Sequence, residues 1–368
     1  MRKVNIGVVG CGNISGIYFS NLTKVFLNTN VYACADLDRE RAEAAKEKYG
    51  IEKIMTFEEM LKCDEIEIIL NLTTPKSHYP ICKKALEAGK HVYVEKPLSL
   101  TYEQGAELKK IADEKGLLLG GAPDTFLGAG ISTCRKLIDD GYIGKPIGAT
   151  AFMMCKGHES WHPDPEFYYE KGGGPMFDMG PYYLTALVNL LGSVDYVCGM
   201  NTMPRKERII TSEKKYGKVI PVETDTHVSG MLKFSCGAVA SIITSFDVIR
   251  SNLPRMEIYG TKGTLLVPDP NTFGGPVMLA TADGSGFKEI PLTHIYAENS
   301  RGLGVSDMAD CVINGGKNRA GAELTLHVLE IMTAFKASEE NMSYYKMKSK
   351  CQRPEPMSSD NIKGTVLP

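Results

Sequence analysis

The sequence predicts an α/β domain built on a parallel sheet over residues 1–124, followed by an α+β domain with a mostly antiparallel sheet over residues 125–368. In the first 120 residues, β-rich runs alternate with helical patterns at short intervals. Such alternation is typical of a parallel sheet covered by helices on both faces. From 194 to 292 alternating strand patterns dominate instead, and two helical segments follow them. A run of strands with helices beside it indicates an α+β arrangement.

Local signals place the individual elements of the first domain. Continuous apolar runs predict strands that are buried on both faces. A helix over 39–49 is expected to end at Gly50, since glycine suits the position after a helix. Thr56 and Glu59 have the spacing of a capping box and predict the start of a short helix. The predicted strands are 4–9, 31–35, 66–72, 92–94 and 117–119.

The second domain is expected to begin with a helix over 126–140 and a strand over 147–155. An aromatic loop rich in glycine and proline follows from 156 to 175, and a helix is predicted over 176–191. Apolar periodicity predicts the later elements. They are strands 226–234, 238–246 and 255–259, and helices near 301–314 and 321–340. The tail beyond about residue 352 is expected to be loosely ordered.

Composition and charge exclude several classes of function. The 42 basic and 44 acidic residues give a formal net charge of −2, which provides no attraction for nucleic acid or for anionic membranes. No apolar run is long enough to span a bilayer, and the short N-terminal apolar run leads into glycines instead of a signal cleavage site. The ten cysteines are scattered without a C-x-x-C pair. We therefore expect a cytoplasmic protein with reduced thiols and no metal site.

A glycine motif predicts a dinucleotide cofactor. The residues Gly10-Cys11-Gly12-Asn13-Ile14-Ser15 follow a predicted strand and open a helix, which is the context that a Rossmann fingerprint requires. Gly10 permits the tight turn, and Gly12 lets the backbone approach a pyrophosphate at the helix N-terminus. Ser15 takes the place of the third glycine, so the match is imperfect. We expect Gly10, Gly12, Asn13 and Ile14 to contact the cofactor.

The next strand ends at Asp36, and this acid bears on the choice between NAD and NADP. A carboxylate at this position accepts hydrogen bonds from the ribose hydroxyls and repels a 2′-phosphate. Leu37 and Asp38 follow, so no cation that would favour NADP stands directly after Asp36, although Arg39 leaves the preference open. The sequence favours NAD over NADP.

A lysine ends the fifth predicted strand, in the tripeptide Glu95-Lys96-Pro97. Strand carboxyl ends in such a sheet face the ligand crevice, so Lys96 is expected to lie beside the nicotinamide. Its ammonium could bind a substrate hydroxyl or lower the pKa of a neighbouring acid. The alternative is a solvated surface lysine.

Three segments together resemble the Gfo/Idh/MocA family of sugar and cyclitol oxidoreductases. They are the GCGNIS turn, residues 73–97 with the EKP motif, and residues 172–192 with the sequence GGGPMFDMGPYYLTALVNLLG. The resemblance covers essentially the whole chain. It implies a Rossmann domain followed by an α+β domain with a large open sheet, often associated into homodimers or homotetramers. It also implies oxidation or reduction of a hydroxyl-bearing carbon of a sugar, glycoside or cyclitol with NAD(P).

The resemblance also implies roles for single residues. Lys96 matches the active-site lysine, and Asp178 matches an aspartate that would position the substrate or Lys96. The residues that match positions along the cofactor are Thr73, Thr74, His78, Glu95 and Lys96. This chain departs from the pattern at Tyr182, where many members have a catalytic histidine, and at Thr185, where they have an aspartate.

Tyr182 could replace the histidine as the group that takes or gives the hydroxyl proton. An unperturbed tyrosine has a pKa of about 10, and a neighbouring Lys96 ammonium would favour the phenolate and lower that pKa. Catalysis is thus assigned to Lys96, Tyr182 and Asp178. The alternative is that Tyr182 and Tyr183 are only aromatic core residues.

The loop 156–175 carries candidate substrate contacts. Flat aromatic rings stack on sugar rings, and imidazoles bond sugar hydroxyls. His158 and His162 flank Glu159 without the spacing of a zinc site, and two prolines argue against a helix there, so no metal is predicted. A merely packed loop is the alternative. The predicted substrate contacts are His158, Trp161, His162 and Tyr168, together with Lys96, Asp178 and Tyr182.

Three functions are compatible with these residues. The first is an NAD-dependent dehydrogenase or reductase of a sugar, glycoside or cyclitol. The second is a redox-assisted glycosidase or eliminase that keeps NAD bound and regenerates it in each turnover. The third is a non-enzymatic sensor of sugar or nucleotide with the same fold. The presence of Lys96, Asp178 and Tyr182 argues against the sensor, because a sensor needs no proton relay.

Overall fold

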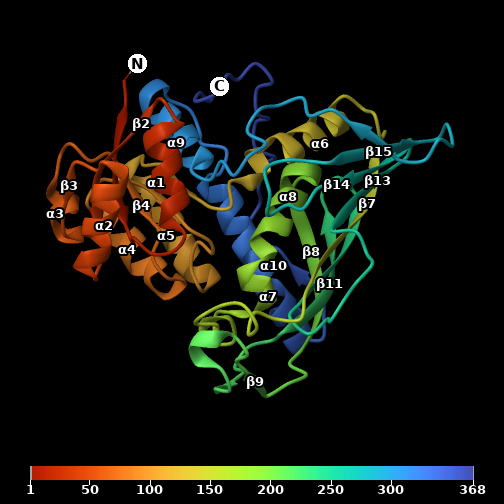
Figure 1. Ribbon diagram of the computed structural model, residues 1–368. Coiled ribbons are helices and arrows are strands. Elements are labelled where there is room, and N and C mark those ends of the chain that lie inside the picture. The colour runs from red at the N-terminus through yellow and green to blue at the C-terminus, as the bar shows by residue number, and fades with distance from the viewer. Residues whose placement is uncertain (1, 368) are drawn as a thin grey trace.

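Two sheets lie side by side in the computed structural model, which describes residues 2–367 (Figure 1). The first sheet has six strands in the order β3-β2-β1-β4-β5-β6, and every pairing is parallel. Its elements are β1 (Val4–Val9), α1 (Ser15–Lys24), β2 (Thr29–Ala35), α2 (Arg39–Tyr49), β3 (Lys53–Ile54), α3 (Phe57–Lys62), β4 (Ile68–Asn71), α4 (Pro75–Glu87), β5 (His91–Val94), α5 (Tyr102–Lys115) and β6 (Leu119–Gly121).

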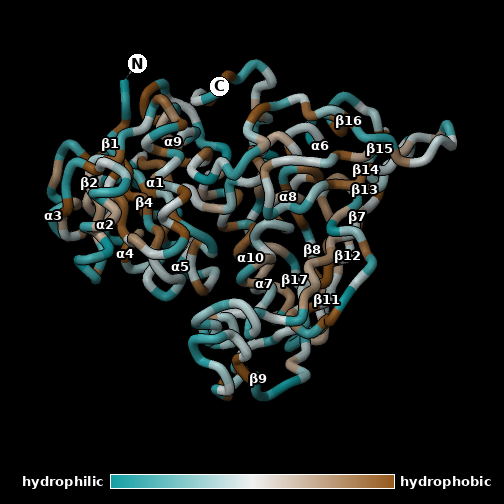
Figure 2. Tube along the Cα trace, viewed as in Figure 1, coloured by the Kyte–Doolittle hydropathy of each residue, from teal (hydrophilic) through white to brown (hydrophobic). Residues whose placement is uncertain are grey.

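Local sequence accounts for these elements. All four residues of β4 are buried, as expected for a central strand covered on both faces. The hydrophobic stretches of the chain run through the middle of this domain in Figure 2. α2 ends at Gly50, which has a φ of 70° that glycine adopts without strain. Thr56 and Glu59 form the predicted reciprocal capping box of α3.

The second sheet has nine strands in the order β16-β15-β14-β13-β7-β12-β11-β8-β17. It is antiparallel except where β7 pairs with β12. A separate two-stranded sheet joins β9 and β10. The elements are η1 (Thr125–Leu127), α6 (Ala129–Asp139), β7 (Pro146–Met154), η2 (Glu166–Tyr168), α7 (Gly174–Asp178), α8 (Gly180–Leu191), β8 (Val194–Thr202), β9 (Glu207–Ile209), η3 (Glu213–Lys215), β10 (Val219–Pro221), β11 (His227–Phe234), β12 (Val239–Ser245), β13 (Met256–Gly260), β14 (Gly263–Val267), β15 (Val277–Thr281), β16 (Lys288–Ile290), α9 (Leu303–Asn314), α10 (Ala322–Glu340) and β17 (Tyr345–Lys346).

Helices α8 and α10 lie between the two sheets and connect them (Figure 1). α10 contacts α5 and β6 of the first domain and β8 of the second. Every residue of α8 is buried. These helices cover the inner face of the large sheet, so the α/β plus α+β prediction is confirmed. None of the helices described within residues 2–367 is long and apolar enough to cross a membrane.

Three local predictions need correction. The helix expected over 176–191 is two helices, because the regular helix is interrupted by a turn at Met179, whose φ of −111° departs from that of a regular helix. The helix expected over 126–140 is a 3-10 turn followed by α6. The tail is not loose: Met357 is buried, and Arg135 Nη1 donates to the main-chain oxygen of Pro354 at 2.9 Å. Tertiary contacts that sequence patterns do not show fix this tail.

Candidate active site

The loops that follow β1, β2, β4 and β5 meet at one edge of the parallel sheet. These four strands run in the same direction, so their carboxyl ends lie together. The loops carry the Gly10 turn, Asp36, Thr73 and Lys96. Ligands of such open sheets bind outside the carboxyl ends of the strands. The sheet topology therefore collects the predicted cofactor residues at a ligand-binding edge.

The glycine turn has the geometry of an anion-binding loop. Gly10 has a φ of 101°, and a Cβ there would lie 2.9 Å from the main chain of Leu72, so only glycine fits. A Cβ on Gly12 would meet nothing within 4 Å, so the backbone is open on that side. Asn13 is exposed, and the N-cap residue of α1 is Ile14, which offers no side-chain cap. The free N–H groups of α1 thus suit a pyrophosphate.

Asp36 is fixed beside this turn. Its Oδ2 accepts a hydrogen bond from the main-chain N of Cys11 at 2.7 Å, and its Oδ1 accepts one from the main-chain N of Asp38 at 2.8 Å. Each carboxylate oxygen has a further lone pair for a ribose hydroxyl. The residues at this edge therefore fit a dinucleotide.

Hydrogen bonds from buried polar groups fix the loop after β4. Thr73 Oγ1 donates to Asn71 Oδ1 at 2.6 Å, whereas Thr74, the N-cap residue of α4, makes no side-chain cap bond. His78 is fully buried, with Nδ1 2.7 Å from the oxygen of Pro97 and Nε2 3.0 Å from the oxygen of Thr73. Burial lowers the pKa of His78. The imidazole ties the loops after β4 and β5 together, so it would act on a cofactor through their positions.

Lys96 reaches across from the first domain to the second. Its Nζ donates to Asp178 Oδ1 at 2.9 Å and to the main-chain oxygen of Asp178 at 2.6 Å. Burial opposes both charges, yet the Asp178 carboxylate holds the pKa of Lys96 well above its usual range. Burial would also raise the pKa of Asp178, but the Lys96 ammonium and the contacts from His158 and Lys96 lower it to about 2. Both groups are therefore charged at neutral pH.

Glu95 lies below Lys96 and faces the interior of the first domain. It is 8% exposed, its Oε1 accepts from the Tyr18 hydroxyl at 2.8 Å, and its Oε2 accepts from the main-chain N of Lys96 at 3.0 Å. The carboxylate therefore orients the lysine-bearing turn.

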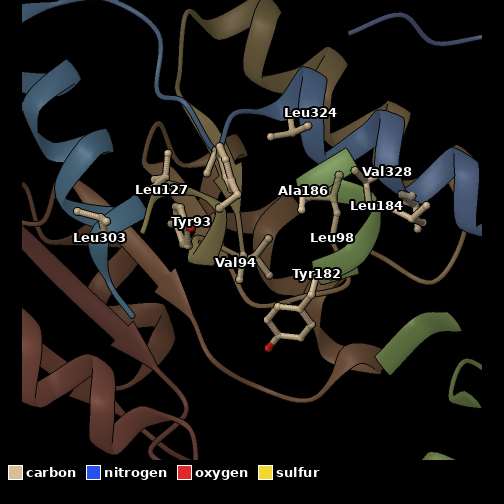
Figure 3. Close-up of a cluster of buried hydrophobic side chains, with 14 of the residues drawn as sticks. Tyr93, Val94, Leu98, Leu127, Tyr182, Leu184, Ala186, Leu303, Leu324 and Val328 are labelled. Atoms are coloured by element: carbon tan, nitrogen blue, oxygen red, sulfur yellow. The ribbon is translucent and has the colours of Figure 1, made fainter. Parts of the chain in front are cut away.

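Tyr182 presents its ring to the lysine. Lys96 Nζ lies 5.3 Å from the centre of the Tyr182 ring. The side chain extends from the start of α8 away from apolar neighbours such as Leu98 and Ala186, with its hydroxyl outermost (Figure 3). Burial raises the pKa of Tyr182, and the nearby Lys96 and Arg301 cations only partly offset that rise. The expectation of a lowered pKa is therefore wrong in its net direction, because burial outweighs the cations.

His158 is the residue of the aromatic loop that reaches this centre. Its Nε2 lies 3.6 Å from Asp178 Oδ2, and this nitrogen has no hydrogen-bond partner among the described residues. The centroid of its ring lies 4.2 Å from the centroid of the Tyr168 ring. Trp161 and His162 lie farther along the loop, and His162 Nδ1 accepts from the main-chain N of Asp164 at 3.0 Å. The structure thus brings together Lys96, Asp178, Tyr182 and His158, and it leaves Trp161 and His162 at the periphery.

Two family models match the chain. An oxidoreductase family with an NAD-binding Rossmann fold matches residues 4–121, and the GFO/IDH/MocA C-terminal domain matches residues 131–266. The chain belongs to the GFO/IDH/MocA oxidoreductase family. The resemblance inferred from the sequence is confirmed. The expected domain boundary at residue 124 falls between the two matched segments and stays a prediction.

Relatives in this family are named dehydrogenases. The scyllo-inositol 2-dehydrogenase (NAD(+)) of Bacillus subtilis (strain 168) is 25% identical over 317 residues, covering 85% of this chain and 87% of that protein. The scyllo-inositol 2-dehydrogenase (NADP(+)) IolW of the same strain is 24% identical over 273 residues, covering 72% and 70%. A solved levoglucosan dehydrogenase in complex with NADH matches with a TM-score of 0.80 and 20% identity, covering 95% of this chain and 100% of that one. At this identity the structural match shows the shared fold.

The departure from the family pattern at Thr185 leaves the candidate site with one acid fewer than that pattern. Thr185 is buried on α8, one turn after Tyr182, and it lines a small cavity with Lys96. The carboxylate that directly engages the Lys96 ammonium is therefore Asp178.

Sequence reasoning missed several residues that shape this family member's site. Arg301, in the turn before α9, lowers the pKa of Tyr182 by its positive charge, and its Nη2 donates to Asn271 Oδ1 at 2.8 Å. Asn71 organises the loop after β4. Arg208, 3% exposed, supports the aromatic loop through Glu159. Their roles depend on contacts between distant segments, so no local motif marks them. The terminal position of Asn71 on β4 is the one signal that could have found it.

Proposed function

We propose that this oxidoreductase uses NAD to interconvert a hydroxyl and a carbonyl on a carbon of a sugar, glycoside or cyclitol, with Lys96 and Tyr182 as the proton relay. The observation that carries the proposal is the Lys96–Asp178 ion pair, which faces Tyr182 at the ligand-binding edge of the first sheet. Bound dinucleotide would supply the hydride acceptor or donor at its nicotinamide ring. The substrate class is inferred from the named relatives, which act on scyllo-inositol and levoglucosan, both polyhydroxylated rings.

Lys96 would polarise the reacting oxygen. An ammonium has three donors, and Lys96 Nζ uses two of them on the main-chain oxygen and the Oδ1 of Asp178. One donor is then available for a substrate oxygen. A preorganised charge next to an oxygen that becomes negative stabilises the transition state. Asp178 acts as the positioning residue, since it fixes the direction of the ammonium.

Tyr182 would exchange the proton. Because its pKa is raised, the phenol is protonated at neutral pH and can donate to the carbonyl oxygen when a ketone is reduced. In the opposite direction the phenolate takes the hydroxyl proton. The Lys96 and Arg301 cations stabilise that phenolate.

The decisive experiment is a screen of sugars, glycosides and inositols with NAD⁺ and with NADP⁺, in which formation of the reduced cofactor is followed by absorbance. Accumulation of NADH with a polyhydroxylated ring is the expected result. Consumption of a glycoside without net NADH would indicate a redox-assisted glycosidase or eliminase. The absence of any turnover across the panel would contradict the dehydrogenase proposal.

Asp36 is proposed to select NAD over NADP. We expect NAD⁺ to be preferred by at least about tenfold in kcat/KM, because the fixed carboxylate repels a 2′-phosphate. The double change Asp36→Ser with Leu37→Arg should shift the preference toward NADP⁺ by about 100-fold. Asp38→Asn is the matched control, since it removes a nearby charge but keeps an oxygen for the N-cap of α2. An unchanged preference in the double variant would remove Asp36 from this role.

The outer face of the nine-stranded sheet supports a homodimer or homotetramer. Tyr196, Met200 and Met231 are 42%, 75% and 51% exposed on the adjacent strands β8 and β11. A second copy could bury this apolar surface. Light scattering should give a mass of at least twice that of the chain, and Met200→Glu with Met231→Glu should lower it. The control Ile362→Glu changes an apolar residue that is 67% exposed on the C-terminal tail, which packs against Tyr296 and not on β8 or β11. A monomeric wild-type protein would contradict the assembly.

A further inference from the structure

A row of aromatic rings leads from the Asp178 carboxylate to the protein surface. We name the rings of His158, Trp161, Phe167 and Tyr168 the aromatic wall. His158 lies at its inner end, 3.6 Å from Asp178 Oδ2. The Tyr168 ring lies 4.2 Å from that of His158, and the Phe167 ring lies 4.0 Å from that of Tyr168. The wall therefore continues the proposed active site outward.

Exposure increases along this row. The His158 side chain is 12% exposed, whereas Phe167 is 48% and Trp161 is 60% exposed. The Trp161 ring meets His158 and His162 in T-shaped contacts at 5.3 Å each, which leave much of the indole surface uncovered. Leaving two large aromatic side chains in water forgoes hydrophobic stabilisation. The outer half of the wall thus offers unused apolar surface next to a polar centre.

Buried and surface ion pairs hold the wall in this position. Arg208 donates from Nη1 to Glu159 Oε1 at 2.9 Å, and its guanidinium lies 5.1 Å from the Tyr169 ring. At the other end of the loop, Glu166 pairs with Lys215 at 2.6 Å and with Lys218 at 2.9 Å. A wall supported on both sides loses little conformational freedom when it binds a ligand.

We propose that the aromatic wall is a distal subsite that stacks the second ring of a two-ring glycoside while its first sugar ring reacts at Lys96 and Tyr182. This inference rests on the proposed function and narrows its substrate class. His158 stands between Asp178 and Trp161, so a single sugar ring held at Lys96 meets His158 first. The exposed indole and phenyl rings beyond it match a longer ligand. An aryl group and a second sugar both present a flat apolar face to such a wall.

The test uses the fluorescence of Trp161, which is the single tryptophan of the chain. The probes are methyl and phenyl β-D-glucopyranoside and cellobiose, with the corresponding galactose, mannose and xylose series, each titrated with and without NAD⁺. In at least one series, a two-ring probe should bind about tenfold tighter than the methyl glycoside and change the Trp161 emission. The phenyl and disaccharide arms show whether the second ring is an aryl group or a sugar.

Variants separate the subsite from the reaction centre. Phe167→Ala should reduce the advantage of the two-ring probe to less than about twofold. Trp161→Ala should lower kcat/KM about tenfold for that probe and leave the methyl glycoside nearly unaffected. Tyr142→Ala is the control, because Tyr142 is 54% exposed on a different part of the chain, beyond α6. This variant should preserve both the binding advantage of the two-ring probe and its kcat/KM.

The results distinguish this inference from the proposed function. If methyl and two-ring probes bind equally in every series, or if Trp161 emission never responds, the distal subsite is wrong even when simple sugars are oxidised. If a two-ring probe binds tightly with the expected variant effects but no NADH forms, the subsite stands and the dehydrogenase proposal fails.

Discussion

Lys96→Met is expected to reduce kcat/KM for the identified substrate by about 10³-fold while the protein still binds the dinucleotide. The substitution keeps most of the side-chain volume but removes the ammonium that would face the reacting oxygen. The cofactor turn at Gly10 and Gly12 is unchanged, so NADH binding measured by its fluorescence should stay within about threefold. A variant that retains activity within about tenfold of wild type would exclude Lys96 from the relay.

Stability measurements separate the loss of chemistry from a loss of fold. In Lys96→Met the Asp178 carboxylate, 19% exposed, stays buried without its cation. Breaking a fully buried pair in this way costs about 3–5 kcal/mol in the free energy of unfolding, and we expect a smaller loss here because both side chains keep some solvent exposure. The double variant Lys96→Met with Asp178→Asn removes both charges, so it should recover much of this stability but none of the activity. Recovery of activity in the double variant would show that the single variant failed by misfolding.

Lys83→Met provides the matched control. Lys83 pairs with Glu107 at 2.7 Å, but their side chains are 34% and 43% exposed. An ion pair in that environment contributes at most about 1 kcal/mol. The same change from lysine to methionine should therefore leave both stability and turnover nearly unaltered.

The fold was predictable wherever local signals decide the structure. β1 and α2 have the predicted limits, because an apolar run fixes the first, and Asp38 and Gly50 cap the second. Short strands such as β3 and β17 were not predicted. Each has two residues and exists because a neighbouring strand offers hydrogen bonds. Tertiary pairing of this kind has no signature within a two-residue segment.

The site was predictable where topology alone brings residues together. Lys96 follows a parallel strand, so its place at the ligand-binding edge followed from the fold. The proximity of His158 to Asp178 and of Arg301 to Tyr182 joins segments that are far apart in the chain. The net pKa shift of Tyr182 was also beyond the sequence, because it depends on how deeply α8 buries the phenol.

The second large effect on the reaction rate is expected for Tyr182→Phe, because this change removes the hydroxyl of the buried phenol. Because burial holds the pKa of Tyr182 above its ordinary value of 10, the phenolate fraction is small at neutral pH and grows as pH rises. Alcohol oxidation needs the phenolate, so its rate should increase with pH through pH 10. Ketone reduction needs the phenol, so its rate should stay level near neutrality and fall only above the raised pKa. Tyr182→Phe should lower kcat about 100-fold or more and abolish both pH dependences.

Tyr183, the next residue in the chain, provides a matched control for Tyr182→Phe. Tyr183 is fully buried on the same helix, and its hydroxyl has no hydrogen-bond partner among the described residues. Tyr183→Phe removes the same atom one position away and should keep wild-type rates and pH profiles. Its stability should be equal or higher, since an unsatisfied buried hydroxyl is removed. If the rise of the oxidation rate with pH persisted in Tyr182→Phe, another group would carry the proton, and Tyr182 would serve only as an aromatic surface against Lys96.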